Sequence, residues 1–211
     1  MGNITSISDH GNKQHSEDLL FSTAIPDRPK VGKEMCIMSD IRQYAETESL
    51  RNGLDICIRA SRPDDSERIV EAFHQLNPES VYLRFFGPKK EISPAELQRF
   101  RETDFDRRVI LLCTVMQEGR EIVIASASYV RAGEDSAEVA FLVEEDFHRL
   151  GIAGRLLKHL GRIAIGAGIK TFIAEVLPHN TAMLGVFKRS GWPMTSEVSD
   201  GTVHLSLALQ S

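Results

Sequence analysis

Three strand-like runs in succession, between positions 108 and 143, constrain the fold of this chain more than any other feature. Arg108–Met116 and Glu121–Val130 each have the composition of a buried strand, and Glu118-Gly119 between them has that of a turn. Ser136–Val143 follows as a third strand. Connections this short join antiparallel neighbours, so we expect an antiparallel meander.

Upstream of the meander, the Asn52-Gly53 pair separates two extended runs and is the strongest short-range signal of a hairpin, whose second strand we expect at Asp55–Ala60. Three helices are expected to follow. One begins near Pro63, a short one carries Val81–Phe86, and the third begins at Ser93–Glu96, a capping box with proline at the first helical position.

Downstream of the meander, helices and strands alternate. The periodicity predicts an amphipathic helix over Gly151–Ala167, a strand over Lys170–Val176, a helix over Thr181–Ser190 and a strand over Thr202–Leu209. The order of elements is therefore hairpin, helices, meander, helix, strand, helix, strand. This order predicts one mixed α/β layer.

Composition excludes several classes of protein. The 211 residues, of which 42% are hydrophobic and 26% charged, match one ordinary globular domain. The formal net charge of −5 argues against nucleic acid as a main partner, because phosphates attract a basic surface. The apolar runs are far shorter than the roughly 20 residues of a membrane helix, so no membrane partner is expected. Three unclustered cysteines and the lack of an evident signal peptide predict a reducing, cytoplasmic location.

The N-terminal segment differs from the rest of the chain. Residues 1–40 are rich in Ser, Asn, Asp and Lys and have no clear apolar period, so we expect a mobile N-terminal tail. A single domain is then expected over residues 41–211.

The turn that opens the helix after the meander is the segment most suited to binding a ligand. Small residues at positions 151, 153 and 154 let the backbone approach a ligand, and the helix start offers free N–H groups to an anion. Arg149 and Arg155 can add charge-assisted bonds. A pyrophosphate-binding turn is one interpretation, and ordinary loop geometry is the other. The Rossmann and Walker spacings are both absent.

Several separated motifs resemble a known family. Ala137–Gly154, followed by Leu177–Met183 and Ser190-Gly191-Trp192, resembles the acetyl-CoA-binding core of the GNAT superfamily of N-acetyltransferases. The stretches 59–65, 80–86 and 104–107 look like the GNAT domains of bacterial Pat-type protein lysine acetyltransferases. The resemblance implies an α/β (α+β) fold with a mixed, mostly antiparallel central sheet flanked by helices on both faces.

The resemblance also implies acetyl-CoA as co-substrate. The backbone of Leu142 and Val143 would bond the pantetheine arm, and Asn180 would lie beside it, although capping the next helix explains an asparagine there equally well. The family binds the pyrophosphate of the cofactor with a Gln/Arg-x-x-Gly-x-Gly/Ala turn. The resemblance implies that the corresponding turn of this chain, which has histidine in the first position, would do the same. Its residues are His148, Arg149, Leu150, Gly151, Ile152, Ala153, Gly154 and Arg155.

In Pat-like domains a glutamate of the third meander strand is the general base, and here it corresponds to Glu138. The reaction needs a general base, because a lysine amine with a pKa near 10.4 is mostly charged at pH 7 and attacks a thioester only when neutral. Strand alternation puts Glu138, Ala140 and Leu142 on one face, which is either a cleft or a solvated sheet surface. Many members carry a tyrosine as the acid for the leaving thiolate, whereas this chain has Phe187.

The remaining candidates concern the acceptor and other chemistry. Tyr82, Phe85 and Phe86 either line the acceptor cleft or belong to the core. The seven histidines have no metal-ligand spacing, so no metal is expected. Cys113 lies in an apolar run and is expected in the core. The first function hypothesis is acetyl transfer to a protein lysine. The alternatives are a small amine such as a polyamine or an aminoglycoside, and a non-catalytic domain that senses acetyl-CoA.

Overall fold

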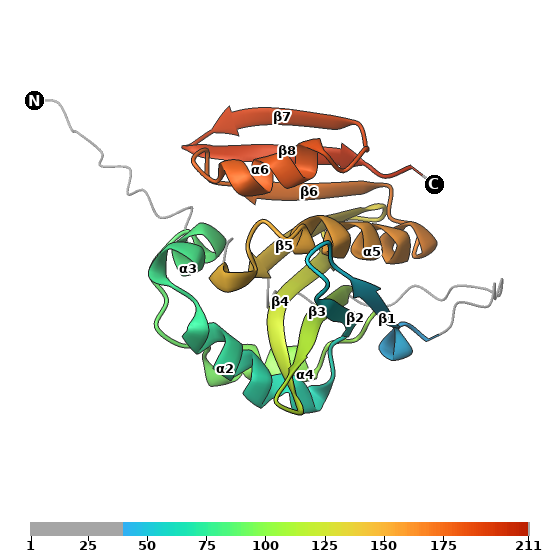
Figure 1. Cartoon of the computed structure of the whole chain (residues 1–211). Coiled ribbons are helices and arrows are strands. Elements are labelled where there is room, and N and C mark those ends of the chain that lie inside the picture. The colour runs from blue at the N-terminus through green and yellow to red at the C-terminus, as the bar shows by residue number, and fades with distance from the viewer. Residues whose placement is uncertain (1–39, 211) are drawn as a thin grey trace, which may run out of the picture.

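The predicted meander forms the centre of an eight-stranded sheet, with the strands in the order β1-β2-β3-β4-β5-β6-β8-β7 (Figure 1). The computed structural model describes residues 40–210. All neighbouring strands are antiparallel except β5 and β6, which are parallel. The strands are β1 (Ala45–Ser49), β2 (Asp55–Ala60), β3 (Arg108–Gln117), β4 (Arg120–Arg131), β5 (Ser136–Val143), β6 (Thr171–Val176), β7 (Met194–Ser199) and β8 (Thr202–Ala208).

Local sequence signals set the starts of the helices. The side chains of Asn77, Ser93 and Asn180 each cap a helix by accepting the backbone N–H of the residue three positions on. The helices are α2 (Ser66–Gln75), α3 (Pro78–Phe85), α4 (Pro94–Arg101), α5 (Ile152–Gly166) and α6 (Thr181–Lys188). Three short 3-10 turns accompany them: η1 (Ile41–Gln43), η2 (Pro63–Asp65) and η3 (Glu145–Phe147).

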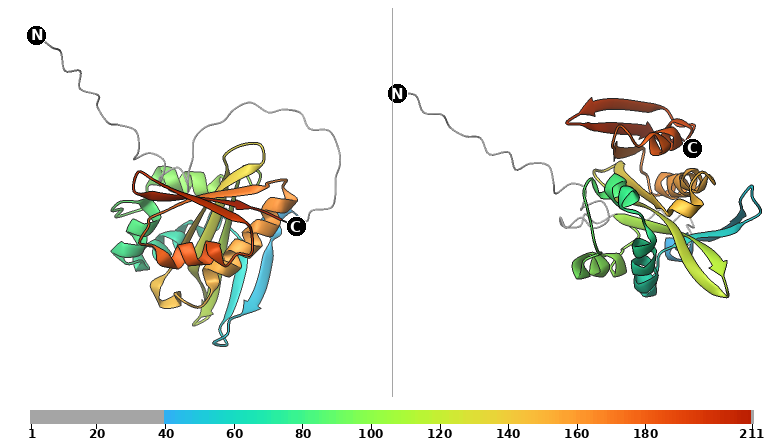
Figure 2. Two further views of the ribbon diagram at one scale, coloured as in Figure 1. Left: turned by 90° about the horizontal axis from the view of Figure 1, so that it is seen from above. Right: turned by 60° about the vertical axis from the view of Figure 1, so that its left-hand side comes forward.

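Alternate residues of β3 serve two different hydrophobic cores. Val109 and Leu111 belong to the core that includes Leu156 of α5, whereas Ile110 belongs to a second core with Phe100 of α4. Helices therefore cover both faces of the sheet (Figure 2). The prediction of a mixed, mostly antiparallel sheet with helices on both faces is confirmed.

The sheet divides between β5 and β6. Only Ser136–Glu138 of β5 pairs with β6, whereas β5 stays paired with β4 as far as Val143. Beyond Glu138 the two halves separate, and β6, β8 and β7 run across the direction of β3 and β4 (Figure 1). The far edge of β5, residues 139–143, thus has no strand partner among the described residues.

The structure adds one strand that the sequence did not predict. β7 (Met194–Ser199) is polar, almost wholly exposed and at the edge of the sheet, so it lacks the apolar alternation of a half-buried strand. The predicted tail over residues 1–40 lies, except for residue 40, outside the described residues. Within residues 40–210, no helix is long and apolar enough to cross a membrane.

Candidate active site

Glu138 lies at the point where the sheet divides. It pairs with Val130 of β4 on one side and with Ile173 of β6 on the other, and it is the last residue of β5 to do so. Its neighbours Ala137 and Val139 are buried in the core beneath α5, so the Glu138 side chain lies on the opposite face, as strand alternation predicts.

A solvent-open cavity of about 510 Å³ adjoins Glu138 on that face. The sequence left open whether Glu138 lies in a cleft or on a solvated sheet surface. The structure shows it at the edge of a cavity. The lining comes from β5, β6, β7 and β8 and from the residue that follows β4. Its members are Ala132, Glu138, Ile173, Ala174, Glu175, Thr195, Ser196, Glu197, His204, Leu205 and Ser206.

Three carboxylates give this cavity a negative lining. Glu175 and Glu197 join Glu138, and both are paired in register with His204 of β8. His204 Nδ1 lies 3.5 Å from Glu175 Oε1. Acidic walls concentrate cations, so the cavity favours a positively charged guest. Sequence reasoning missed Glu175, Glu197 and His204. The alternation of side chains along β6 and β8 could have placed Glu175 and His204 on one face of the sheet.

The N-terminus of α5 lies at the other end of β5. Gly151 is its N-cap, with φ of +83°, and no side chain caps the helix there. The first N–H groups of a helix lack intrahelical acceptors, so those of Ile152, Ala153 and Gly154 remain available to an anion. A Cβ at Gly154 would meet no atom within 4 Å, which leaves room for a ligand.

Two predicted pyrophosphate ligands already have protein partners. His148 Nε2 lies 2.9 Å from the carbonyl oxygen of Val143, which closes the turn between β5 and α5. Arg155 forms an ion pair with Glu48 of β1 and donates to the carbonyl oxygen of Ser49. Arg149 is exposed, with φ of +63°. Of the three basic side chains, Arg149 therefore has the fewest competing contacts.

The aromatic residues of α3 do not form one surface. Phe85 is 7% exposed and packs with Phe73 and Val81, whereas Tyr82 is 45% exposed. Phe86, half-buried, ends α3 in the left-handed conformation. Phe187 is buried against Phe141, with ring centroids 5.8 Å apart.

Arg84, on the same helix, is a further residue that sequence reasoning missed. It is 7% exposed, and neither terminal nitrogen of its guanidinium has a hydrogen-bond partner among the described residues. Burial lowers its pKa to about 10, and the charges of Glu138 and Glu96 act in the opposite direction. The sequence feature that could have drawn attention to Arg84 is its position among the apolar residues of α3.

Cys113 is confined to the core, as predicted. It is fully buried in β3, and burial raises the pKa of its thiol to about 12. A thiolate nucleophile is therefore disfavoured at this position.

A polar cluster joins β1 to α5 away from the cavity. Ligand atoms of Glu46, Glu48 and His159 all lie within 4.8 Å of one another, which is close enough to hold a metal ion. Arg162 and Arg155 already form ion pairs with the two glutamates, and His159 Nε2 lies 2.6 Å from Glu48 Oε1. The cluster thus balances its charges within the protein.

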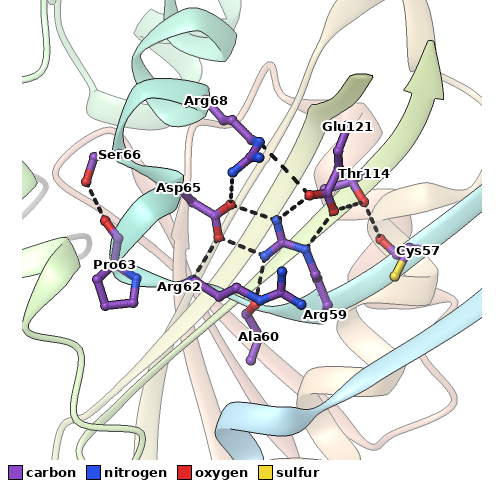
Figure 3. Close-up of polar contacts among 10 residues, drawn as sticks. All are labelled: Cys57, Arg59, Ala60, Arg62, Pro63, Asp65, Ser66, Arg68, Thr114 and Glu121. Atoms are coloured by element: carbon purple, nitrogen blue, oxygen red, sulfur yellow. Dashed lines mark hydrogen bonds and ion pairs between the residues drawn. The ribbon is translucent and has the colours of Figure 1, made fainter. Parts of the chain in front are cut away.

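The upstream stretch 59–65 is structural. Arg59 donates to Asp65 and Glu121 and so ties β2 to the start of α2 and to β4 (Figure 3). Arg68 of α2 approaches the same two carboxylates. These contacts account for Arg59 and Asp65 by stability alone.

Comparison with known proteins identifies the family. The model of the acetyltransferase (GNAT) family matches residues 70–192, more than half of the chain. The chain belongs to the GNAT acetyltransferase family. The GNAT domain of S. lividans Pat superposes with a TM-score of 0.72 at 36% identity, covering 78% of this chain and 97% of that domain.

Two curated relatives are both acetyltransferases, and one of them is a Pat. The acetyltransferase Pat of Mycolicibacterium smegmatis is 33% identical over 144 residues, which are 67% of this chain and 42% of Pat. This chain thus spans less than half of that relative. An acetyltransferase of Pseudomonas aeruginosa is 27% identical over 156 residues, 74% of this chain and 84% of the relative. The protein is an N-acetyltransferase.

Proposed function

We propose that this GNAT enzyme transfers an acetyl group from acetyl-CoA to the side-chain amine of a protein lysine, by direct attack in a ternary complex. The observation that carries the proposal is the position of Glu138, at the divide of the sheet and on the wall of an acidic cavity. The Pat-type relatives favour the lysine acceptor. The same negative cavity also suits a polyamine or an aminoglycoside, which are the alternative acceptors.

Acetyl-CoA would lie between the N-terminus of α5 and Glu138. The pyrophosphate would bind the N–H groups of the turn 148–155, and the pantetheine arm would follow the unpaired edge of β5. From Val143 back to Glu138 the strand spans about 17 Å, which suits an extended arm. Leu142 and Val143 would bond that arm through their backbone. Asn180 would approach it while its side chain caps α6, since its oxygen accepts the N–H of Met183 at 3.1 Å.

Glu138 would act as the general base. It takes a proton from the lysine ammonium, directly or through water, because only the neutral amine attacks. The amine nitrogen then bonds the acetyl carbon and gives up its second proton to solvent, the carbon–sulfur bond breaks, and CoA leaves as a thiolate that takes up a proton. Phe187 has no proton to donate, so the thiolate is protonated by solvent or leaves without the help of an acid. A thiol pKa near 8.5 makes the thiolate an acceptable leaving group.

The proposal is tested by CoA-thiol release from acetyl-CoA with lysine-bearing proteins, polyamines and aminoglycosides as acceptors. Glu138→Gln should abolish turnover with the accepted class while acetyl-CoA still binds. Glu134→Gln is the matched control, because it makes the same change at an exposed position four residues upstream. Turnover that survives Glu138→Gln would exclude Glu138 as the base. Binding of acetyl-CoA without turnover on any acceptor would favour the sensor hypothesis.

A further inference from the structure

Arg155 and Glu48 form an ion pair beside the first turn of α5. Arg155 is the fourth residue of that helix, and Glu48 belongs to β1. Nη2 of Arg155 also donates to the carbonyl oxygen of Ser49, at 3.4 Å. Long side chains of a helix point back toward its N-terminus. The guanidinium of Arg155 is therefore directed toward the turn whose free N–H groups can bind an anion.

The carboxylate of Glu48 has a second partner, which is buried. Oε1 of Glu48 lies 2.6 Å from Nε2 of His159, which is one turn beyond Arg155 on α5 and 1% exposed. Burial acts to raise the pKa of Glu48, but the hydrogen bonds from His159 and Arg155 outweigh it and lower that pKa. An ionised carboxylate only accepts, so the imidazole donates. Glu48 therefore keeps a hydrogen-bonded partner even when Arg155 is elsewhere.

The bond to Arg155 is the one that a ligand can replace. The side chains of Arg155 and Glu48 are 33% and 26% exposed, and ion pairs that stay in contact with solvent are weak. A pyrophosphate offers several charged oxygens to a guanidinium, and such charge-assisted bonds are strong. A pyrophosphate bound at the N-terminus of α5 can thus take Arg155 away from Glu48.

We propose that Glu48 competes with the pyrophosphate of acetyl-CoA for Arg155 and so weakens the binding of the cofactor. The inference rests on the cofactor position proposed above, at the turn 148–155. In the free enzyme Arg155 pairs with Glu48. In the complex Arg155 bonds a phosphate oxygen, and Glu48 stays on His159. The same competition favours the release of CoA, because CoA carries the same pyrophosphate.

A second ion pair between β1 and α5 supplies the matched control. Glu46 lies two residues before Glu48 on β1 and pairs with Arg162 at 3.1 Å. Arg162 is seven residues beyond Arg155, so it lies about 10 Å further from the N-terminus of α5. Glu46→Gln therefore removes the same charge from the same strand without freeing an arginine beside the turn.

The test is the Kd for acetyl-CoA, measured by isothermal titration calorimetry at low salt. Glu48→Gln keeps an amide oxygen for His159 and should lower the Kd about threefold, because the competing ion pair is lost. Arg155→Met should raise the Kd, and adding Glu48→Gln to it should change nothing more. Glu46→Gln should leave the Kd unchanged. The kcat/KM for acetyl-pantetheine, which has no pyrophosphate, should be the same in all variants.

Three results would overturn the inference. The first is an unchanged or higher Kd in Glu48→Gln. The second is a Kd that Glu48→Gln lowers equally in the Arg155→Met background, which would reflect only the lost negative charge. The third is an equal decrease in Glu46→Gln. If Gly154→Ala weakens binding while Glu48→Gln has no effect, the competition alone is refuted. If neither changes the Kd, the proposed cofactor position is refuted with it.

The wild type covers the case in which Glu48→Gln does not fold. A crystal structure of the enzyme with CoA should show Arg155 bonded to a phosphate oxygen and Glu48 still bonded to His159. Arg155 remaining on Glu48 in that complex would refute the competition.

Discussion

Arg59 and Asp65 form a two-point ion pair beneath the start of α2 (Figure 3). Nη1 and Nη2 of Arg59 each donate to one carboxylate oxygen of Asp65, both at 2.7 Å, and the two side chains are 2% and 0% exposed. Asp65 also accepts the backbone N–H of Arg62. The pair joins β2 to α2, and through Glu121 it joins both to β4.

Asp65→Asn should destabilise the protein by about 3 kcal/mol, because the substitution breaks a buried ion pair and leaves Arg59 with Glu121 as its remaining charged partner. Asp64→Asn is the matched control, since it makes the same change at an exposed neighbour. Urea denaturation at pH 7 measures both. Equal effects of the two substitutions would show that the ion pair contributes nothing specific.

The free energy of unfolding should fall in acid. Burial opposes ionisation of Asp65, yet the hydrogen bonds from Arg59 and the Arg62 N–H, together with the charges of Arg59 and Arg68, outweigh it, so the pKa of Asp65 lies below its usual 3.8. The hydrogen bond from Arg59 likewise lowers the pKa of Glu121 below 4.5. Groups with a depressed pKa stabilise the fold above their unfolded pKa, and this stabilisation is lost as pH falls through the folded pKa.

Urea denaturation between pH 7 and pH 3 should therefore show stability that changes little above about pH 5 and declines below it. Glu144, whose pKa is raised by burial, acts in the opposite sense. Asp65→Asn should flatten the decline, whereas Asp64→Asn should retain the wild-type slope. A decline of the same steepness in Asp65→Asn would assign the acid sensitivity to other groups.

The parts of the fold with a strong local period could be predicted from the sequence. Hydrophobic runs and the Asn52-Gly53 turn located the meander and the hairpin, and capping residues located α4 and α6. β7 was missed because a polar edge strand gains its structure from pairing with β8, which leaves no apolar pattern in its own sequence.

The candidate site was only partly readable for a related reason. Strand alternation gave the face of Glu138, but the side chains around it come from β6, β7, β8 and α3, which are distant in sequence. Similarly, nothing local indicated that Arg155, expected at a phosphate, forms an ion pair with Glu48 of β1. Such contacts depend on how elements pack, which composition and spacing do not encode.

Gly161→Ala should destabilise the protein by about 2 kcal/mol. A Cβ at Gly161 would lie 2.1 and 2.6 Å from two ring atoms of Trp192, so α5 or the indole must shift. The free-energy cost of this clash exceeds the roughly 1 kcal/mol by which alanine is favoured over glycine in a helix. Gly154→Ala, in the same helix but with no atom within 4 Å of the added Cβ, is the control and should not destabilise. Thermal unfolding compares the two, and similar melting temperatures would contradict the predicted clash.

Gly154→Ala should nevertheless weaken acetyl-CoA binding. The open space beside Gly154 lies at the uncapped N-terminus of α5, where a methyl group would occupy room that the pyrophosphate needs. We expect the KM for acetyl-CoA to rise about tenfold, equivalent to about 1.4 kcal/mol, with little change in kcat. Gly87→Ala is the control for adding a methyl group elsewhere. Gly87 follows α3, and the nearest atom to its added Cβ is 4.0 Å away. Steady-state kinetics at a saturating acceptor concentration give both constants, and an unchanged KM in Gly154→Ala would mean that the cofactor does not approach α5 at this residue.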